Sequence, residues 1–240
     1  LEAYQPISGQ YNVRLDANES FLSLPGEIMH EINVGISQID FNRYPDPYAV
    51  ELCKKFGAYF QVPAELVVAA NGSDELLFLL TTCFASAGDK LMVVKPDFSM
   101  YKVYAELADL QVEVFHKTTD FGLNVDELIA TAKEKNVQML IFSNPCNPTS
   151  LLLSKEDILK IVAALEDVLV VVDEAYMDFA EGTVLHEVEQ YSNLLVLKTF
   201  SKAFGLAAAR LGFAISNKTI IDALKAAKSP YNVNTMSQVV

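Results

Sequence analysis

The sequence predicts an α/β fold, with a mostly parallel sheet and helices on both of its faces. Short apolar runs rich in β-branched residues recur from Val67 to Ile215 and alternate with stretches of helical apolar spacing. The runs also lack the apolar–polar alternation of strands that expose one face, as expected where helices cover both faces of a parallel sheet. This order of elements favours an open, doubly wound sheet.

The first part of the chain is predicted to differ from the rest. Residues 1–40 are irregular, with prolines and glycines among short apolar clusters, and indicate an N-terminal arm with one short helix. Residues 41–240 are predicted to form one large domain. Arg43–Pro47 is a loop, because each proline fixes its own φ and biases the preceding residue toward extended geometry. Helical apolar spacing returns from Tyr48 to Phe60.

Strands and helices then alternate. The predicted strands are the apolar runs Val67–Ala70, Leu91–Val94, Val112–Phe115, Met139–Phe142, Leu169–Val172, Leu194–Leu197 and Gly212–Ile215. The predicted helices are Asp74–Ala85, Met100–Leu107, Val125–Lys133, Lys155–Leu165 and Thr219–Ala227. Ser154 followed by Asp157 resembles a capping box at the start of one of these helices.

Composition excludes several classes of protein. The 240 residues are 51% hydrophobic and 20% charged, so the chain can bury a substantial core. A net charge of −13 argues against a nucleic-acid partner, which needs a basic face. The three cysteines, Cys53, Cys83 and Cys146, suggest neither a disulfide framework nor a metal site. No apolar run has the length of a membrane span and no signal segment is visible, so a cytoplasmic protein is expected.

Polar residues directly follow four of the predicted strands. They are Asn71–Asp74, Ser143–Thr149, Asp173–Tyr176 and Lys198–Lys202. In an open α/β sheet, ligands bind in the crevice beyond the carboxyl ends of the strands. The four segments bring amide, hydroxyl, carboxylate, phenol and ammonium groups to that edge. Their convergence predicts a binding site there.

Each segment also has a purely structural interpretation. Asn71–Ser73 is an ordinary turn with a helix cap in most proteins, or else an anion site at a helix start. Asp173 is a cap or surface acid, or else a carboxylate that keeps a heteroaromatic nitrogen protonated. A tyrosine in the position of Tyr176 most often only packs against its neighbours.

Lys202 and Arg210 lie in unusually apolar stretches. A lysine is usually a solvated surface group, but the neighbours of Lys202 are small or apolar, and desolvation there would lower its pKa. Arg210 is the only charged residue in 206–211 and needs a partner, which a bound phosphate would supply.

Together these segments resemble the large domain of the fold type I, pyridoxal-phosphate-dependent aminotransferases. The resemblance covers nearly the whole chain and rests on Asn144–Thr149, Asp173–Tyr176, Ser201–Gly205 and Arg210. Within that family, the histidinol-phosphate aminotransferase branch is similar at Leu1–Tyr4, Asp16–Glu19 and Asn42–Asp46.

The resemblance implies roles around the cofactor, pyridoxal 5'-phosphate. Lys202 would hold its aldehyde as a Schiff base and then move the substrate proton. Asp173 would pair with the pyridinium nitrogen, while Tyr176 and Asn147 would hydrogen-bond the ring hydroxyl oxygen. Phe98 would stack on the ring. The alternative is that Phe98 is simply a residue of the hydrophobic core.

The resemblance also assigns the phosphate and substrate contacts. The phosphate would be held by Gly72, Ser73, Thr199, Ser201 and Arg210, with Tyr44 reaching over from a second subunit. Asp74 is expected among the cofactor-binding residues. Asn18 would border the substrate. The implied protein is a homodimer that acts on a small amino donor and a 2-oxo acid. The pair that the resemblance favours is histidinol phosphate and 2-oxoglutarate.

Other activities remain open, because substrate contacts rather than the fold decide among them. They are an aspartate or aromatic aminotransferase, an amino acid phosphate decarboxylase, a C–S lyase, and a non-catalytic cofactor-binding module. Lys202 together with Asp173 and Tyr176 counts against the last. Serine stands at position 150, where the family usually has glycine, and little effect is expected.

The family continues into a smaller C-terminal domain of roughly 100 residues, a usual domain size. That domain carries the arginine that grips the substrate acid group, and it is absent from this chain. The 240-residue piece alone is therefore expected to have little or no transaminase activity.

Overall fold

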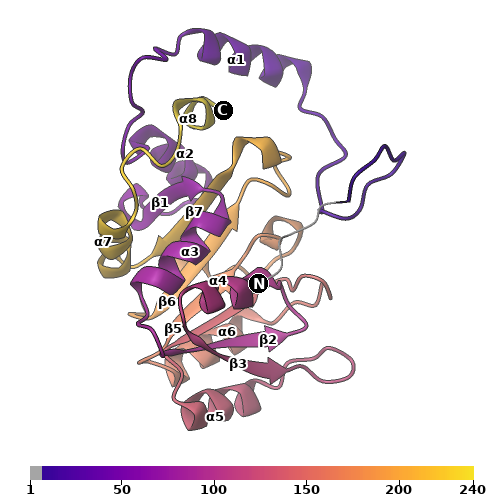
Figure 1. Cartoon of the computed structure of the whole chain (residues 1–240), viewed down its shortest axis with the longest axis vertical. Helices are drawn as coiled ribbons and strands as arrows, with labels where there is room; N and C mark the ends of the chain where they lie inside the picture. The colour runs from indigo at the N-terminus through magenta and orange to yellow at the C-terminus, as the bar shows by residue number, and fades with distance from the viewer. Residues whose placement is uncertain (1–6) are drawn as a thin grey trace.

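A seven-stranded sheet crosses the computed structural model, which describes residues 7–240 (Figure 1). The strands are β1 (Val67–Asn71), β2 (Lys90–Lys95), β3 (Gln111–His116), β4 (Met139–Ser143), β5 (Leu169–Asp173), β6 (Leu194–Thr199) and β7 (Leu211–Ser216). Their order across the sheet is β1-β7-β6-β5-β4-β2-β3. β2 to β6 pair in parallel, and β7 runs antiparallel to β1 and β6. The predicted α/β class with a mostly parallel sheet is confirmed.

The helices are α1 (Gly26–Ser37), α2 (Val50–Phe60), α3 (Ser73–Cys83), α4 (Met100–Leu107), α5 (Val125–Lys135), α6 (Lys155–Ala164), α7 (Lys218–Ala227) and α8 (Thr235–Val239). Short 3₁₀ turns occupy Ala64–Leu66, Met177–Phe179, Leu185–Glu187 and Ala207–Ala209. Every predicted strand and helix is present to within two residues at each end, whereas α8 was not predicted. The Ser154 hydroxyl accepts a hydrogen bond from the Asp157 N–H at 3.1 Å, so the cap on α6 is confirmed.

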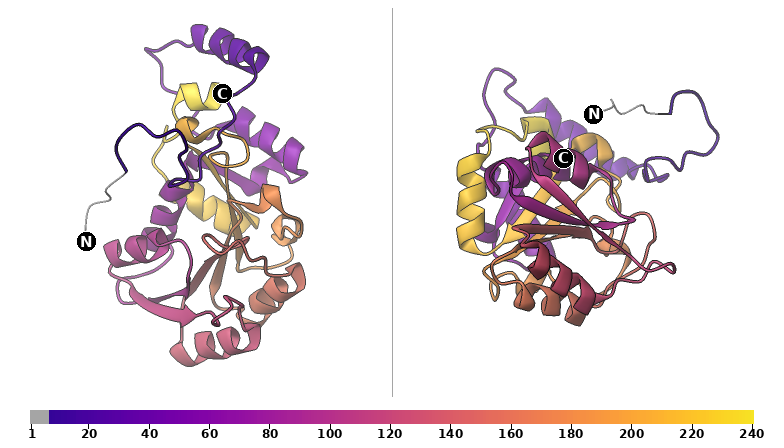
Figure 2. Two further views of the ribbon diagram at one scale, coloured as in Figure 1. Left: turned by 90° about the vertical axis from the view of Figure 1, so that its right-hand side faces the viewer. Right: turned by 60° about the horizontal axis from the view of Figure 1, so that its bottom comes forward.

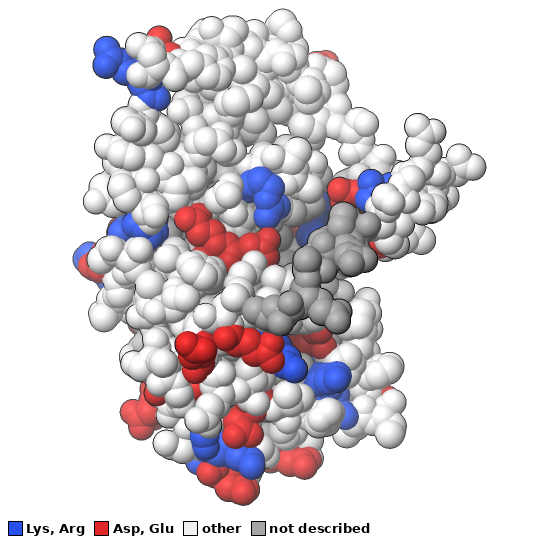
Figure 3. Space-filling view, viewed as in Figure 1, with Lys and Arg blue, Asp and Glu red and all other residues white. Residues whose placement is uncertain are grey.

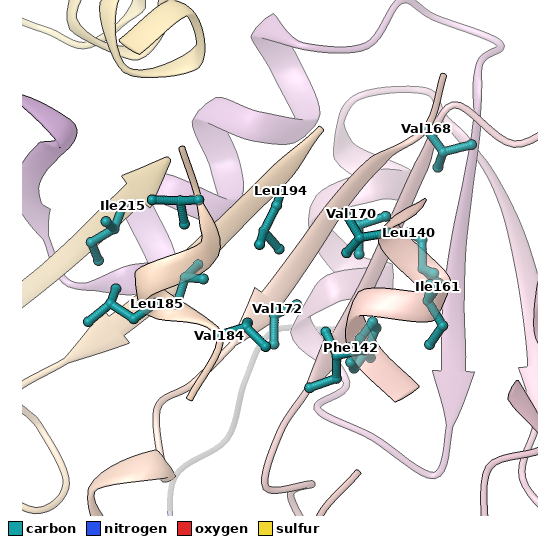
Figure 4. Close-up of a cluster of buried hydrophobic side chains, with 14 of the residues drawn as sticks. Leu140, Phe142, Ile161, Val168, Val170, Val172, Val184, Leu185, Leu194 and Ile215 are labelled. Atoms are coloured by element: carbon teal, nitrogen blue, oxygen red, sulfur yellow. The ribbon is translucent and has the colours of Figure 1, made fainter. Parts of the chain in front are cut away.

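Helices cover both faces of the sheet, as the apolar runs predict. One face packs against α2, α5 and α6, and the other against α3, α4 and α7. Along β5, Val170 and Val172 point to the first face and Val171 to the second, and all three are fully buried. Figure 4 shows the first face, where Ile161 of α6 lies beside Phe142 and Val184 lies beside Val172.

The antiparallel direction of β7 decides which residues meet at the functional edge. Gly212 pairs with Thr199, and Leu211 pairs with Asn71, so β7 begins where β6 and β1 end. Ser143 pairs with Asp173 at the ends of β4 and β5. The residue before β7, Arg210, is therefore placed beside the residues that follow four other strands.

The N-terminal segment stands apart from the sheet and then returns to it. α1 has no buried residue and contacts α8, and Figure 2 shows it projecting at one end of the molecule. Upstream of α1, the backbone carbonyl of Ala17 accepts a hydrogen bond from Lys202. The Leu1–Tyr4 part of the resemblance lies outside the described residues.

Ser150 adopts a left-handed backbone conformation, with φ of 60°. Its N–H donates to the carbonyl of Cys146 at 2.7 Å and closes the turn after β4. Glycine adopts this φ without strain, so serine carries a small conformational cost at this turn.

On the face shown in Figure 3, Lys and Arg side chains lie in small separate groups among Asp and Glu. None of the helices within residues 7–240 combines the length and the apolar character that crossing a membrane requires.

Candidate active site

A cavity of about 860 Å³ opens at the edge of the sheet where β1, β4, β5 and β6 end. It brings together eleven of the thirteen predicted site residues: Asn18, Ser73, Asp74, Phe98, Asn147, Asp173, Tyr176, Thr199, Ser201, Lys202 and Arg210. The other two, Gly72 and Tyr44, do not line it. In the described part of the chain, no three His, Cys, Asp or Glu side chains gather as a metal site would need.

Asp173, the last residue of β5, presents a buried carboxylate to the cavity. Its Oδ1 accepts the N–H of Ala175 at 3.0 Å, and its Oδ2 accepts the hydroxyl of Tyr101 at 2.9 Å. Burial raises the pKa of the Asp173 carboxyl to about 6, although both hydrogen bonds favour the ionised form. Asp173 is thus a desolvated acid that a cation in the cavity would stabilise.

Lys202 follows β6 and brings a half-buried amine into the same cavity. Its Nζ donates to the Ala17 carbonyl at 2.8 Å and lies 5.9 Å from the centre of the Tyr176 ring. Burial lowers the pKa of Lys202, which favours the neutral, nucleophilic amine. By contrast, Lys198 is buried between Glu174 and Asp178, at 3.8 and 3.5 Å.

The remaining side chains surround the space between these two groups. The Asn18 amide donates to the Tyr176 hydroxyl at 2.9 Å, which ties the N-terminal segment to the cavity. The Asn147 N–H donates to the Ser143 hydroxyl at 3.0 Å. Phe98 presents an aromatic ring to the cavity. Planar, polar and cationic groups therefore face one enclosed volume.

One end of the cavity carries groups that suit an anion. Ser73 begins α3, where free backbone N–H groups and the helix dipole favour negative charge. Thr199 and Ser201 share a hydrogen bond at 3.0 Å between their hydroxyl oxygens. The Arg210 guanidinium lies 3.4 Å from the Ser201 hydroxyl and 3.1 Å from the Asp74 carboxylate. Hydroxyls, N–H groups and a guanidinium are a phosphate-binding set.

Gly72 and Gly212 allow this end to close. Gly72 has a φ of 79°, and a Cβ on it would lie 2.5 Å from Arg210 Nη2. A Cβ on Gly212 would lie 2.3 Å from the backbone at both Gly72 and Ser73. Gly72 therefore acts through its backbone shape, and Gly212 is a residue that the sequence analysis missed.

Gly212→Ala is expected to lower the free energy of unfolding by roughly 2 to 3 kcal/mol, because backbone atoms of the Gly72–Ser73 turn must move. Urea denaturation measures the loss. Gly26→Ala is the matched control, since a Cβ at Gly26 meets nothing within 4 Å. Equal free energies of unfolding for the two variants would show that the close contact at Gly212 does not constrain the residue at this position.

Tyr44 lies outside the cavity. Its side chain is 81% exposed and stacks on Tyr231, with 4.6 Å between ring centroids. Among the described residues, its recorded side-chain contact is with Tyr231 and not with another predicted site residue, so its assigned role stays a prediction.

Four ionisable side chains of the lining were not predicted: Asp16, Glu19, Tyr101 and Tyr104. The Tyr104 hydroxyl donates to the Asp74 carboxylate at 3.2 Å. Tyr101 and Tyr104 share one face of α4, and their spacing was interpreted only as helical. The signal available in the sequence was three aromatic residues spaced three apart, Phe98, Tyr101 and Tyr104.

Comparison with known proteins identifies the family. The profile described as "Aminotransferase class I and II" matches residues 12–240. The chain belongs to this family. A curated relative, the histidinol-phosphate aminotransferase of Clostridium novyi (strain NT), is 44% identical over 237 residues. That match covers 99% of this chain and 66% of the relative, so the chain spans about two thirds of the relative's length.

Solved structures of an aminotransferase and of a decarboxylase share the fold. The histidinol-phosphate aminotransferase from Sinorhizobium meliloti, in complex with pyridoxal-5'-phosphate, aligns with a TM-score of 0.87 at 22% identity. The alignment covers 93% of this chain and 61% of that one. The L-threonine-O-3-phosphate decarboxylase from Porphyromonas gingivalis aligns with a TM-score of 0.77 at 21% identity, over 92% of this chain and 66% of that one. The fold is therefore that of the fold type I large domain.

Proposed function

We propose that this chain is the large part of a pyridoxal-phosphate-dependent aminotransferase acting on histidinol phosphate and 2-oxoglutarate. The observation that carries the proposal is the single cavity lined by the Lys202 amine, the Asp173 carboxylate and the Arg210 guanidinium. The choice of amino donor rests on the 44% identity to the clostridial histidinol-phosphate aminotransferase.

The residues present fit pyridoxal phosphate on chemical grounds. A desolvated primary amine suits its aldehyde, and a buried carboxylate suits its ring nitrogen. The α3 N-terminus with Thr199, Ser201 and Arg210 suits its phosphate. Phe98 offers a ring face, and Asn147 and Tyr176 offer polar groups for the ring hydroxyl.

When bound, the cofactor supplies an electron sink conjugated to the α-carbon of the amino donor. The chain's residues then divide the remaining tasks. Lys202 Nζ is the base that takes the proton from that α-carbon and returns it at another position. Asp173 holds a proton on the ring nitrogen by charge pairing. Arg210 and the α3 N-terminus hold the phosphate, and the Asn18 amide orients the Tyr176 hydroxyl, which would bond the ring hydroxyl.

We further propose a cytoplasmic homodimer in which residues 1–40 form the N-terminal arm and residues 41–240 the cofactor-binding domain. The exposure of Tyr44, Phe21 and Leu15 supports the dimer, because large apolar side chains are costly to leave in water. In that dimer, Tyr44 would complete the phosphate site of the partner subunit.

Product analysis tests the reaction, using a protein of the length of its relatives. With histidinol phosphate and 2-oxoglutarate, we expect glutamate to form in step with loss of the donor. Histidinol without its phosphate is the matched control donor and should react more slowly. Carbon dioxide from an amino acid phosphate would instead indicate a decarboxylase, and pyruvate with a thiol a C–S lyase. Cofactor binding without any turnover would indicate a binding module.

A further inference from the structure

Tyr101 on α4 is the largest buried polar side chain next to the cavity. It is 1% exposed, and its hydroxyl donates to Asp173 Oδ2 at 2.9 Å. The Phe98 ring meets the Tyr101 ring edge-on, with 5.4 Å between centroids. Tyr101 thus connects the aromatic lining of the cavity with its buried acid.

We infer that Tyr101 is a positioning residue that keeps Asp173 ionised and fixes its carboxylate toward the cofactor ring nitrogen. The inference rests on the proposed function, since the ring nitrogen belongs to the proposed cofactor.

The hydrogen bonds of Asp173 support this role. The Ala175 N–H is a backbone donor that any residue except proline would supply at position 175. The Tyr101 hydroxyl is a side-chain donor from another element, and it prevents rotation of the carboxylate. Donation to the ionised acid lowers the pKa of Asp173 against the burial that raises it.

Tyr101 can donate throughout the working pH range. Burial, followed by the charge of Asp173, raises its pKa well above the ordinary value of 10, so the hydroxyl keeps its proton. Its only good role beside a carboxylate is therefore that of a donor.

The charges around Asp173 make this donor necessary. The Asp97 and Asp74 carboxylates both raise the pKa of Asp173. Lys117 is the cation beside Asp97, at 3.9 Å, and Lys202 and Arg210 line the same cavity as Asp173. Arg210 is itself paired with Asp74. Among these groups, Tyr101 is the side chain that bonds the Asp173 carboxylate directly.

Tyr101→Phe tests the inference in the cofactor-free protein of full length. Loss of the donor should raise the pKa of Asp173 by about 1, equal to a tenfold change in its ionisation constant. The destabilisation measured by urea midpoints should therefore grow as the pH rises from about 6 to about 8, where Asp173 must ionise. In an Asp173→Asn background, Tyr101→Phe should lower the free energy of unfolding by the same amount at every pH.

Cofactor affinity gives a second readout. Tyr101→Phe should bind pyridoxal phosphate about tenfold more weakly, and this effect should vanish in the Asp173→Asn background. Tyr191→Phe, which removes a hydroxyl on the opposite face of the sheet, is the matched control and should change neither readout.

A destabilisation by Tyr101→Phe that is independent of pH, or identical with and without Asp173, would overturn the inference and leave Tyr101 a packing residue. Failure of the proposed function looks different. The unmutated protein would then not bind pyridoxal phosphate, while the pH comparison in the cofactor-free protein would still report on Tyr101 and Asp173.

Discussion

Lys202→Ala is expected to lower kcat for amino transfer by at least about 10⁴-fold. The substitution removes the amine that attaches the cofactor and the base that moves the α-carbon proton. No other lysine lines the cavity within the described residues, and nearby Lys198 is committed to Glu174 and Asp178. Steady-state and single-turnover kinetics measure the loss.

Two controls separate chemistry from folding. Lys202→Arg keeps a positive charge but cannot bond the aldehyde, so it should be as inactive as Lys202→Ala. A small primary amine added to Lys202→Ala should restore part of the proton transfer, because it can occupy the space left by the side chain. Retention of more than a tenth of the activity in either variant would exclude Lys202 as the base.

Asp173→Asn is expected to lower kcat/KM by about 10²- to 10³-fold, because a neutral amide does not hold a proton on the ring nitrogen by charge pairing. Asp173→Glu keeps the charge and should lose less. If Asp173→Asn were as active as the unmutated protein, the carboxylate would not be paired with the ring.

Asp173→Asn should also stabilise the cofactor-free protein. The pKa of Asp173 rises from its ordinary 3.8 to about 6 on folding, so the folded state holds its proton more tightly than the unfolded state. The free energy of unfolding therefore falls as the pH rises from about 4 to about 6, by about 3 kcal/mol.

Above pH 6, Asp173→Asn removes that cost and should raise the free energy of unfolding by roughly 1 to 3 kcal/mol. Below pH 4 the gain should disappear, since Asp173 is then protonated in both states. Urea unfolding at pH 4 and pH 7.5 measures both values. A loss of stability at pH 7.5 would show that burying the ionised carboxylate does not destabilise the cofactor-free protein.

Local patterns were sufficient to predict most of the fold. Val170–Val172 indicated β5 because a short run of β-branched apolar residues without alternation is typical of a strand buried on both faces. Asp173 and Lys202 were found because each follows such a strand, and parallel strands end at the same edge.

The rest of the site depends on contacts between residues far apart in the sequence. The approach of Gly212 to Ser73 requires β7 to lie antiparallel beside β1, and periodicity does not specify strand direction. The hydrogen bond from Lys202 to Ala17 joins residues 185 positions apart. Tyr101 appeared as a helical apolar residue, since a buried phenol and a packed aromatic ring give the same pattern.

Borohydride reduction in the presence of pyridoxal phosphate, followed by peptide mapping, tests most directly whether Lys202 holds the cofactor opposite Asp173. We expect one stable phosphopyridoxyl adduct, on the peptide that contains Lys202, and none in Lys202→Ala. An adduct confined to another lysine, or no adduct at a cofactor concentration that saturates binding, would contradict the assignment of this cavity as the active site.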